Sequence, residues 1–414
     1  MTTINSSNSN DRLVSDLPLH VFDKLVARPH SAIANPIDLR QQILFKLQAN
    51  TVDDGSSITA VRALLKLSPP TMLRTLDPCL TYVECNRLLS RIYRECAAKP
   101  LSALEMMRRA QSSSIEKIPT GLSSLDHQLH GGLPVGSVVE IVGRAGAGKT
   151  HLSQQLCVLA SQSGGGAVFI DAEKKLNLMR LREIAFERFL QKQQHHLQNQ
   201  HANELADQVL ENVTIHSLVS TQDLLDKLDD IGNEITSRNS DAAQYEQSGN
   251  VPNASTRRRL PVRLIVIDSI AAPIRRDYDM MGGSSSNTAA LRASALFQIA
   301  KRLKQLAYDY QVAVVVINQV GSGGMFSNRN DLQRNNALDI RDGEFTASLG
   351  TAWQYCVSTR IVFEHEDDPH RLQQEQPGDG ENCIRVATLA KSLVSKRFKL
   401  SFELTKRGLC EVSD

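Results

Sequence analysis

The spacing of apolar residues separates the chain into two parts with different secondary structure. Between residue 17 and about residue 109, apolar positions recur at helical intervals and are interrupted by prolines and by an Asp-Asp-Gly turn. This spacing predicts amphipathic helices over residues 37–48, 58–67 and 82–96. We therefore expect a small all-helical N-terminal domain with its linker over residues 15–110, after a Ser/Asn-rich disordered tail over residues 1–14.

The second part, residues 111–414, has the pattern of an α/β core. Short apolar runs typical of buried strands occur at residues 138–142, 167–170, 213–216, 264–267 and 312–317. Helical patterns lie between them, at residues 150–160, 178–189, 221–235 and 289–310. This alternation predicts a mostly parallel, twisted sheet with helices on both faces. Later apolar runs at residues 352–363, 384–389 and 398–404 predict closing strands that could run antiparallel.

Four polar segments interrupt this core, near residues 191–201, 237–259, 321–345 and 364–382. Segments of this composition bury too little apolar surface to order themselves, so we interpret them as surface insertions. The first contains His195, His196 and His201, which could suggest a metal site. No cysteine or carboxylate has the matching spacing, and a solvated loop is the better interpretation.

Composition and charge narrow the class of protein. The chain has 414 residues, of which 41% are hydrophobic and 22% are charged, as in ordinary globular proteins. Seven cysteines without a CxxC pair favour a reducing compartment over a disulfide scaffold or a zinc ribbon. No apolar stretch is long enough for a membrane span, and the polar N-terminus has no secretory signal.

The formal net charge of 47 − 45 = +2 excludes a protein held on nucleic acid by bulk charge. Two adjacent segments nevertheless have opposite charge. Residues 364–381 contain seven acidic residues and one arginine, a balance of −6, and residues 383–407 contain seven basic residues and one glutamate, a balance of +6. A local basic patch is therefore compatible with the near-neutral total.

A phosphate-binding loop is the strongest motif in the chain. Residues 143–150 match the P-loop pattern G-x4-G-K-[ST], between a predicted strand and a predicted helix. Its backbone N–H groups and the helix N-terminus would face the phosphates of a nucleotide, Lys149 would reach the β- and γ-phosphates, and Thr150 would bind Mg²⁺. The candidate nucleotide-binding residues are Gly143, Arg144, Ala145, Gly146, Ala147, Gly148, Lys149 and Thr150.

Three further polar residues follow predicted strands. Asp268 ends the run 264–267 and is the candidate second Mg²⁺ ligand. Glu173 follows the run 167–170 and could activate a water, and Gln319 follows the run 312–317 and could sense the γ-phosphate. Ligands in such sheets bind beyond the carboxyl ends of the strands, where these side chains would meet. For Glu173 and Gln319 taken alone, a functional and a purely structural role are equally good interpretations.

These motifs resemble those of the RecA-like strand-exchange recombinases of homologous recombination, in their eukaryotic branch. The resemblance runs from about residue 118 to residue 409. It rests on the lead-in TGLSSLD at residues 120–126, the GGLP at residues 131–134 and the INQV at residues 317–320. Within this family, DSIAAPIR at residues 268–275 is similar to the recombinase paralogues rather than to the main recombinase.

The resemblance implies a RecA-like P-loop ATPase core that uses ATP and Mg²⁺. It implies an ATP-binding mediator of double-strand-break repair, with weak DNA-dependent ATP hydrolysis, in the nucleus. Its partners would be single-stranded or junction DNA, a C-type recombinase paralogue and the main strand-exchange recombinase. Glu173 would be the catalytic carboxylate acting with Lys149 and Gln319, and Arg180 would stack on adenine. Residues 275–288 and 321–346 would correspond to the two DNA loops.

Several departures from the family pattern keep alternatives open. The element after Asp171 reads AEKKL, without the family's glycine and aromatic residue, and the linker motif at residues 100–103 lacks its phenylalanine. A structural adaptor that binds ATP with little hydrolysis is one alternative, and an active recombinase that forms its own filaments is another. The basic stretches 275–304 and 383–407 are either DNA contacts or ordinary solvated faces, and sparse aromatic residues predict modest, salt-sensitive DNA affinity.

Overall fold

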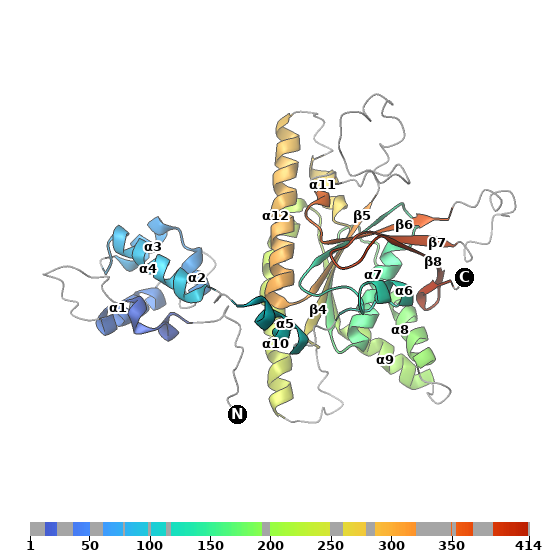
Figure 1. Ribbon diagram of the computed structural model, residues 1–414, viewed down its shortest axis with the longest axis horizontal. Coiled ribbons are helices and arrows are strands. Elements are labelled where there is room, and N and C mark those ends of the chain that lie inside the picture. Colours follow the sequence, from blue (N-terminus) through green and yellow to red (C-terminus); the bar gives the residue numbers. More distant parts are fainter. Residues whose placement is uncertain are drawn as a thin grey trace. The chain divides into compact units, whose positions relative to one another are not determined.

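The chain forms two compact units, Met1–Ser112 and Ser113–Asp414, in a computed structural model (Figure 1). Each unit has its own apolar core, and each is described by itself. The structure describes residues 13–22, 36–49, 61–77, 79–97, 101–112, 117–192, 199–248, 260–278, 286–319, 349, 353–366 and 384–412.

The described part of the first unit is helical. Its elements are η2 (Val14–Asp16), η3 (Leu19–Val21), α1 (Pro36–Ala49), α2 (Val61–Lys66), α3 (Pro69–Leu76), α4 (Tyr82–Cys96) and α5 (Ala103–Ser112). The side chains of Phe22, Ile43, Met72 and Leu88 are buried together in its core. Thr81 and Glu84 form a capping box that begins α4, which explains why its predicted start matches the structure.

The Pro69-Pro70 pair marks the expected break between α2 and α3 and also begins α3. Both prolines stand in the first turn of α3, where their missing N–H groups cost no helical hydrogen bond, and the Ser68 hydroxyl accepts a hydrogen bond from the backbone N–H of Thr71. The expected disordered tail also differs from the structure at its end. Val14 is fully buried in the helical core, and residues 1–12 lie outside the described part.

The second unit is built on one nine-stranded sheet. The strands are β1 (Val138–Gly143), β2 (Gly166–Asp171), β3 (Val213–Ser217), β4 (Val262–Asp268), β5 (Ala313–Gln319), β6 (Thr359–His365), β7 (Arg385–Lys391), β8 (Phe398–Thr405) and β9 (Gly408–Glu411). Their order is β3-β2-β4-β5-β1-β6-β7-β8-β9. The pairs from β3 to β6 are parallel and the pairs from β6 to β9 are antiparallel. The predicted α/β, RecA-like fold class is therefore confirmed.

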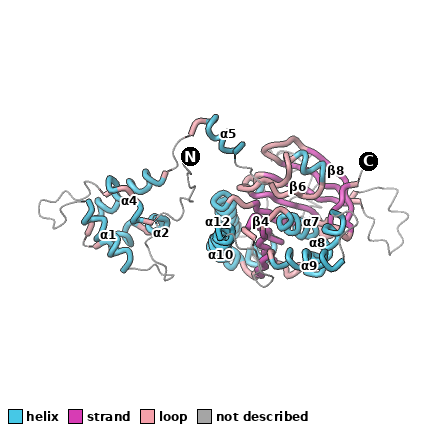
Figure 2. Tube along the Cα trace, turned by 90° about the horizontal axis from the view of Figure 1, so that it is seen from below, coloured by secondary structure: helices cyan, strands magenta, loops and turns pink. Residues whose placement is uncertain are grey.

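Helices cover both faces of this sheet (Figures 1 and 2). One face carries α6 (Ser123–Gln128), α7 (Lys149–Gln162), α8 (Leu178–Lys192) and α9 (Asn199–Glu211), and the other carries α10 (Thr221–Ser248), α11 (Ala271–Tyr278) and α12 (Ser286–Tyr310). Alternate strand residues serve the two cores: Val139 and Ile141 point to the first face, and Val138 points to the second. None of the described helices is long and apolar enough to cross a membrane.

Two of the predicted polar insertions contain helix. Residues 199–201 belong to α9, and α10 continues to Ser248 through the first half of the predicted insertion 237–259. The helix continues because Arg238 is buried and its guanidinium donates to the backbone oxygens of Asn212 and Leu260. Residues 321–345 and 367–382 lie outside the described residues. The predicted strand 352–363 begins only at Thr359, after a helical turn at Trp353.

A buried carboxylate ties the central strands together. Glu140 of β1 is 0% exposed, and its Oε2 accepts a hydrogen bond of 2.6 Å from Nε of Arg360 on β6. Its Oε1 accepts from Nδ2 of Asn318 on β5 at 2.7 Å and from Nε1 of Trp353 at 3.1 Å. Breaking such a pair from one side leaves an uncompensated buried charge, which makes the pair a stability determinant of this unit.

We predict that Glu140→Gln lowers the free energy of unfolding of the second unit by about 3–5 kcal/mol, because Arg360 keeps its charge without a partner. Urea denaturation followed by the fluorescence of Trp353, the only tryptophan, measures this unit. The control is Asp229→Asn, which breaks the exposed pair between Asp229 and Arg302 and should cost less than about 1 kcal/mol. Equal losses in the two variants would contradict the prediction.

Candidate nucleotide-binding site

The P-loop connects β1 to α7 in a conformation that requires its glycines. Gly146 and Gly148 have φ values of +79° and +95°, in the left-handed region where side chains are strained. At Gly143, a Cβ would lie 2.3 Å from the backbone oxygen of Phe363 on the adjacent strand β6. The first turn of α7 leaves backbone N–H groups without helical partners, as an anion-binding loop needs.

Lys149 lies at the start of α7 with its ammonium group directed back into the loop. It is buried, and Nζ donates to the backbone oxygens of Gly143 at 2.8 Å and Arg144 at 2.6 Å. Burial lowers the pKa of Lys149, and the carboxylates of Asp268 and Glu173 oppose this shift. The cation is therefore held in the loop by groups that a bound phosphate could replace.

Thr150 and Asp268 meet beside the P-loop, as the sequence predicts for a metal side. Thr150 Oγ1 donates to Oδ2 of Asp268 at 2.7 Å, although β4, which carries Asp268, is separated from β1 by β5. Burial raises the pKa of Asp268 from 3.8 to about 6, against the Thr150 hydrogen bond. A hydroxyl and a carboxylate are hard oxygen donors that fit Mg²⁺, which keeps further ligands from water and phosphate.

Glu173 and Gln319 also come together at this edge of the sheet. Oε1 of Glu173 accepts hydrogen bonds of 2.5 Å from Nε2 of Gln319 and from the Ser269 hydroxyl, and its other oxygen forms an ion pair with Lys175. Burial acts to raise the pKa of Glu173. The hydrogen bonds from Lys175 and Ser269 and the charge of Lys175 together outweigh this effect, so the net shift of the pKa is downward.

Gln319 links this carboxylate to α11. Its Oε1 accepts a hydrogen bond of 2.8 Å from Nη2 of Arg275, while its amide nitrogen donates to Glu173. In the sheet, Gln319 is also paired with Gly143, the first P-loop residue. A change at the phosphate end of the site can therefore reach Arg275 through one amide.

Asp171 positions Glu173 and was not singled out from the sequence. At the end of β2, its carboxylate accepts backbone N–H groups of Glu173 at 3.2 Å, Lys175 at 3.1 Å and Leu176 at 2.9 Å. Lys174, which stands where the resembled family has glycine, has a φ of +55°. A left-handed lysine costs about 1–2 kcal/mol, so Asp171 holds the turn in a conformation that its sequence disfavours.

Arg385 and His365 are two more residues beside the P-loop that sequence reasoning missed. Nε of Arg385 on β7 donates to the backbone oxygen of Gly146 at 3.3 Å, and Nε2 of His365 on β6 is 3.7 Å from the position of a Cβ on Gly146. Burial and the charges of Arg180 and Arg385 lower the pKa of His151. The available signal was the position of Arg385 in the predicted closing strand 384–389, within the basic stretch 383–407.

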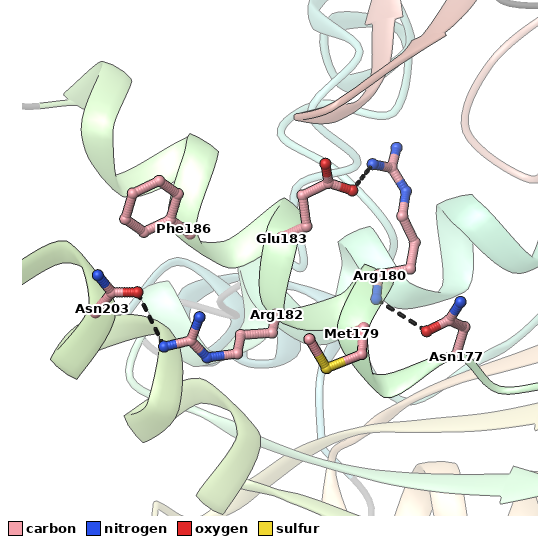
Figure 3. A pocket seen from close by; sticks show the side chains of 7 residues that line it. All are labelled: Asn177, Met179, Arg180, Arg182, Glu183, Phe186 and Asn203. Atoms are coloured by element: carbon pink, nitrogen blue, oxygen red, sulfur yellow. Dashed lines mark hydrogen bonds and ion pairs between the residues drawn. The ribbon is translucent and has the colours of Figure 1, made fainter. Parts of the chain in front are cut away.

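Arg180, the candidate adenine-stacking residue, lies on α8 and is bound by its own chain. Its guanidinium forms an ion pair with Glu183 and donates to the backbone oxygens of Thr405 and Lys406 in the β8–β9 turn. Figure 3 shows Arg180 turned toward Glu183 at one end of a depression of about 460 Å³ on α8 and α9. Stacking on adenine would require these contacts to change.

The two basic stretches both leave charge exposed, and in the stretch 275–304 the exposed basic residues include Lys301 and Lys304. In the stretch 275–304, Arg275 is bonded to Gln319, Arg276 donates to the backbone oxygens of Val219 and Ala172, and Arg302 pairs with Asp229. In the stretch 383–407, the exposed basic residues are Lys396, Arg397, Lys399 and Lys406. Residues 279–285 of the first candidate DNA loop and all of the second, 321–346, lie outside the described residues.

A P-loop after a central parallel strand, with a Thr–Asp pair on its metal side, defines a P-loop protein with a RecA-like core. The described residues hold no group of three or more His, Cys, Asp or Glu side chains that could bind a metal ion. A family model of the RecA N-terminal domain matches residues 88–228, and a Rad51 family model matches residues 239–331. The chain therefore contains RecA/Rad51 family domains.

Several relatives of the chain are RAD51 paralogues. It is 29% identical to DNA repair protein RAD51 homolog 2 of Mus musculus over 74% of this chain and 82% of the relative. It is 28% identical to the DNA repair protein XRCC3 homolog of Arabidopsis thaliana over 74% of this chain and 96% of the relative. It is 30% identical to DNA repair protein RAD51 homolog 3 of Dictyostelium discoideum over 64% of this chain and 61% of the relative. The expected resemblance to recombinase paralogues is confirmed.

The raised pKa of Asp268 predicts a specific pH dependence of stability. The folded protein keeps the Asp268 proton up to about pH 6, whereas the unfolded chain loses it near 3.8. The contribution of Asp268 to the free energy of unfolding therefore falls as the pH rises between these values. Without nucleotide or metal, Asp268→Asn should gain about 2–3 kcal/mol over wild type between pH 4 and pH 7.

Urea denaturation at several pH values, followed by Trp353 fluorescence, measures this difference. The exposed Asp230→Asn variant is the control, and its profile should run parallel to that of wild type. A parallel profile for Asp268→Asn would contradict the assigned shift.

Proposed function

We propose that the protein is an ATP-binding, DNA-dependent ATPase that acts as a mediator in homologous-recombination repair of DNA double-strand breaks. The convergence of Lys149, Thr150, Asp268, Glu173 and Gln319 at one sheet edge carries this proposal. The three relatives described above are all named DNA repair proteins, which supports a role of this protein in DNA repair. A protein with this role works in the nucleus.

Each residue of the site has a role in ATP binding and hydrolysis. Lys149 and the N–H groups of residues 143–150 bind the phosphates, and Thr150 and Asp268 hold Mg²⁺, which would neutralise phosphate charge. Glu173 accepts the proton of the attacking water. The amide of Gln319 senses the γ-phosphate. Because Gln319 is bonded to Arg275 at the start of the first candidate DNA loop, nucleotide state and DNA contact are coupled.

The same geometry favours a second candidate, an ATP-bound structural adaptor with little hydrolysis. Glu173 accepts hydrogen bonds from Lys175, Ser269 and Gln319, and its pKa is lowered, which makes it a weaker base. Lys175 must release the carboxylate before a water can be activated. DNA binding that rearranges this loop would give a slow, DNA-dependent rate.

The proposed partners are single-stranded or junction DNA, another recombinase paralogue of the C type as a heteromer, and the main strand-exchange recombinase. The linker at residues 100–103 lacks the phenylalanine of the family's self-assembly motif, which favours a defined heteromer over a long filament of one chain. The exposed lysines and arginine of the stretch 383–407 supply salt-sensitive phosphate contacts.

We predict that Glu173→Gln lowers DNA-stimulated ATP hydrolysis by about 10²- to 10⁴-fold while ATP affinity is retained, because glutamine cannot accept the proton of water. Phosphate release with Mg²⁺ and oligothymidylate measures the rate. The matched control is Glu234→Gln, which changes a glutamate of α10 paired with His216 on the edge strand β3 and should leave the rate unchanged. Equal rates for Glu173→Gln and wild type would remove the enzymatic role and leave the adaptor.

A further inference from the structure

The outward face of α12 presents an aromatic and basic stripe to solvent. Phe297, Lys301, Lys304 and Tyr308 follow one another at intervals of four, three and four residues, which places them on one side of the helix. Phe297 is 54% exposed and Tyr308 is 73% exposed. Tyr355, in the turn before β6, is 75% exposed and lines the same depression.

This depression, which we name the α12 groove, has a volume of about 580 Å³. Among the described residues of the second unit, Phe297, Tyr308 and Tyr355 are the aromatic side chains that are more than half exposed, and all three line it. Exposed aromatic residues gathered in one concavity are typical of protein–protein interfaces, where they insert or receive the residues that dominate binding energy.

The α12 groove lies at the opposite end of the strands from the P-loop. Its residues come from the second half of α12, which leads into the start of β5, and from the turn before Thr359. Thr359 is paired with Val139 near the start of β1, whereas Gly143 and Gln319 are paired at the P-loop end. A ligand in the groove would therefore not touch the nucleotide site.

The charge beside these aromatic residues is mainly positive. Lys301 and Lys304 are exposed on the groove, and the charges of Lys304 and Lys391 act on Cys356 at its wall, lowering a thiol pKa that burial raises. Nζ of Lys391 is held by the backbone oxygens of Gln354 and Val357. Asp309 is the acidic residue among the described lining residues.

We propose that the α12 groove docks an acidic segment of a partner protein that carries an aromatic or leucine side chain. The apolar side chain enters between Phe297, Tyr308 and Tyr355, and flanking carboxylates pair with Lys301 and Lys304. A nucleic acid fits less well, because it requires a continuous track of cations, and here two lysines lie beside Asp309 while Arg302 is paired with Asp229. Docking here does not depend on ATP binding.

The test selects peptides from a random display library on the full-length chain and measures the enriched peptides by fluorescence anisotropy. We expect enriched sequences with acidic residues around an aromatic or leucine residue. Their affinity should fall at least about tenfold in Phe297→Ser/Tyr308→Ser and, more strongly at low salt, in Lys301→Glu/Lys304→Glu. Leu291→Ser changes a residue of α12 that is 62% exposed and outside the groove, and should leave binding unchanged.

Two further measurements keep the outcomes distinct. ATP affinity and the urea midpoint of Trp353 fluorescence should be the same in Phe297→Ser/Tyr308→Ser and wild type, which separates this surface from the nucleotide site and from folding. The proposal would be overturned if the selection enriched no acidic peptide. It would also be overturned if the enriched peptides bound the groove variants and wild type with equal affinity. Weakened binding of labelled oligothymidylate in Phe297→Ser/Tyr308→Ser would also overturn it and assign the groove to nucleic acid.

Discussion

The fold of the second unit depends on one buried carboxylate. Glu140 binds Arg360, Asn318 and Trp353, and these contacts join β1 to β5 on one side and to β6 on the other. Because side chains alternate along a strand, a shift of one residue in either pairing would break these contacts and expose the charge to an apolar core. The same registers place Gly143 beside Gln319 and Phe363, so the geometry of the P-loop edge follows from this polar cluster.

At that edge, two neighbouring carboxylates have pKa values shifted in opposite directions by their surroundings. Asp268 is almost fully buried and has few donors, so its pKa rises to about 6 and it is prepared for a cation. Glu173 accepts hydrogen bonds from three side chains, and its pKa is lowered. Opposite pKa shifts of neighbouring titratable groups are a common way for a site to give them different protonation states. Under the proposed function, the contact of Glu173 with Lys175 predicts slow hydrolysis until Lys175 moves.

The strands, the P-loop and the polar residues at the strand ends could be predicted from local sequence patterns. Gly143 to Thr150 follow from phosphate chemistry, and Asp268 and Gln319 follow because parallel strands end at one edge. Other features depend on contacts between distant segments. Arg385 is separated by 239 residues from Gly146, whose backbone oxygen it contacts. The continuation of α10 past residue 236 depends on the hydrogen bonds of Arg238 to backbone oxygens of distant segments. Local sequence patterns likewise could not predict that Arg180 contacts the β8–β9 turn, which lies 226 residues further along the chain.

The central claim is that the loop between β1 and α7 binds ATP through Lys149. Equilibrium binding of labelled ATP with Mg²⁺ to full-length wild type and to Lys149→Ala tests it most directly, with Lys227→Ala, on the surface of α10, as the matched control. The account predicts saturable binding to wild type and to Lys227→Ala, and a loss of affinity of at least about tenfold in Lys149→Ala. Unchanged ATP affinity in Lys149→Ala would contradict the assignment of this loop as the nucleotide site.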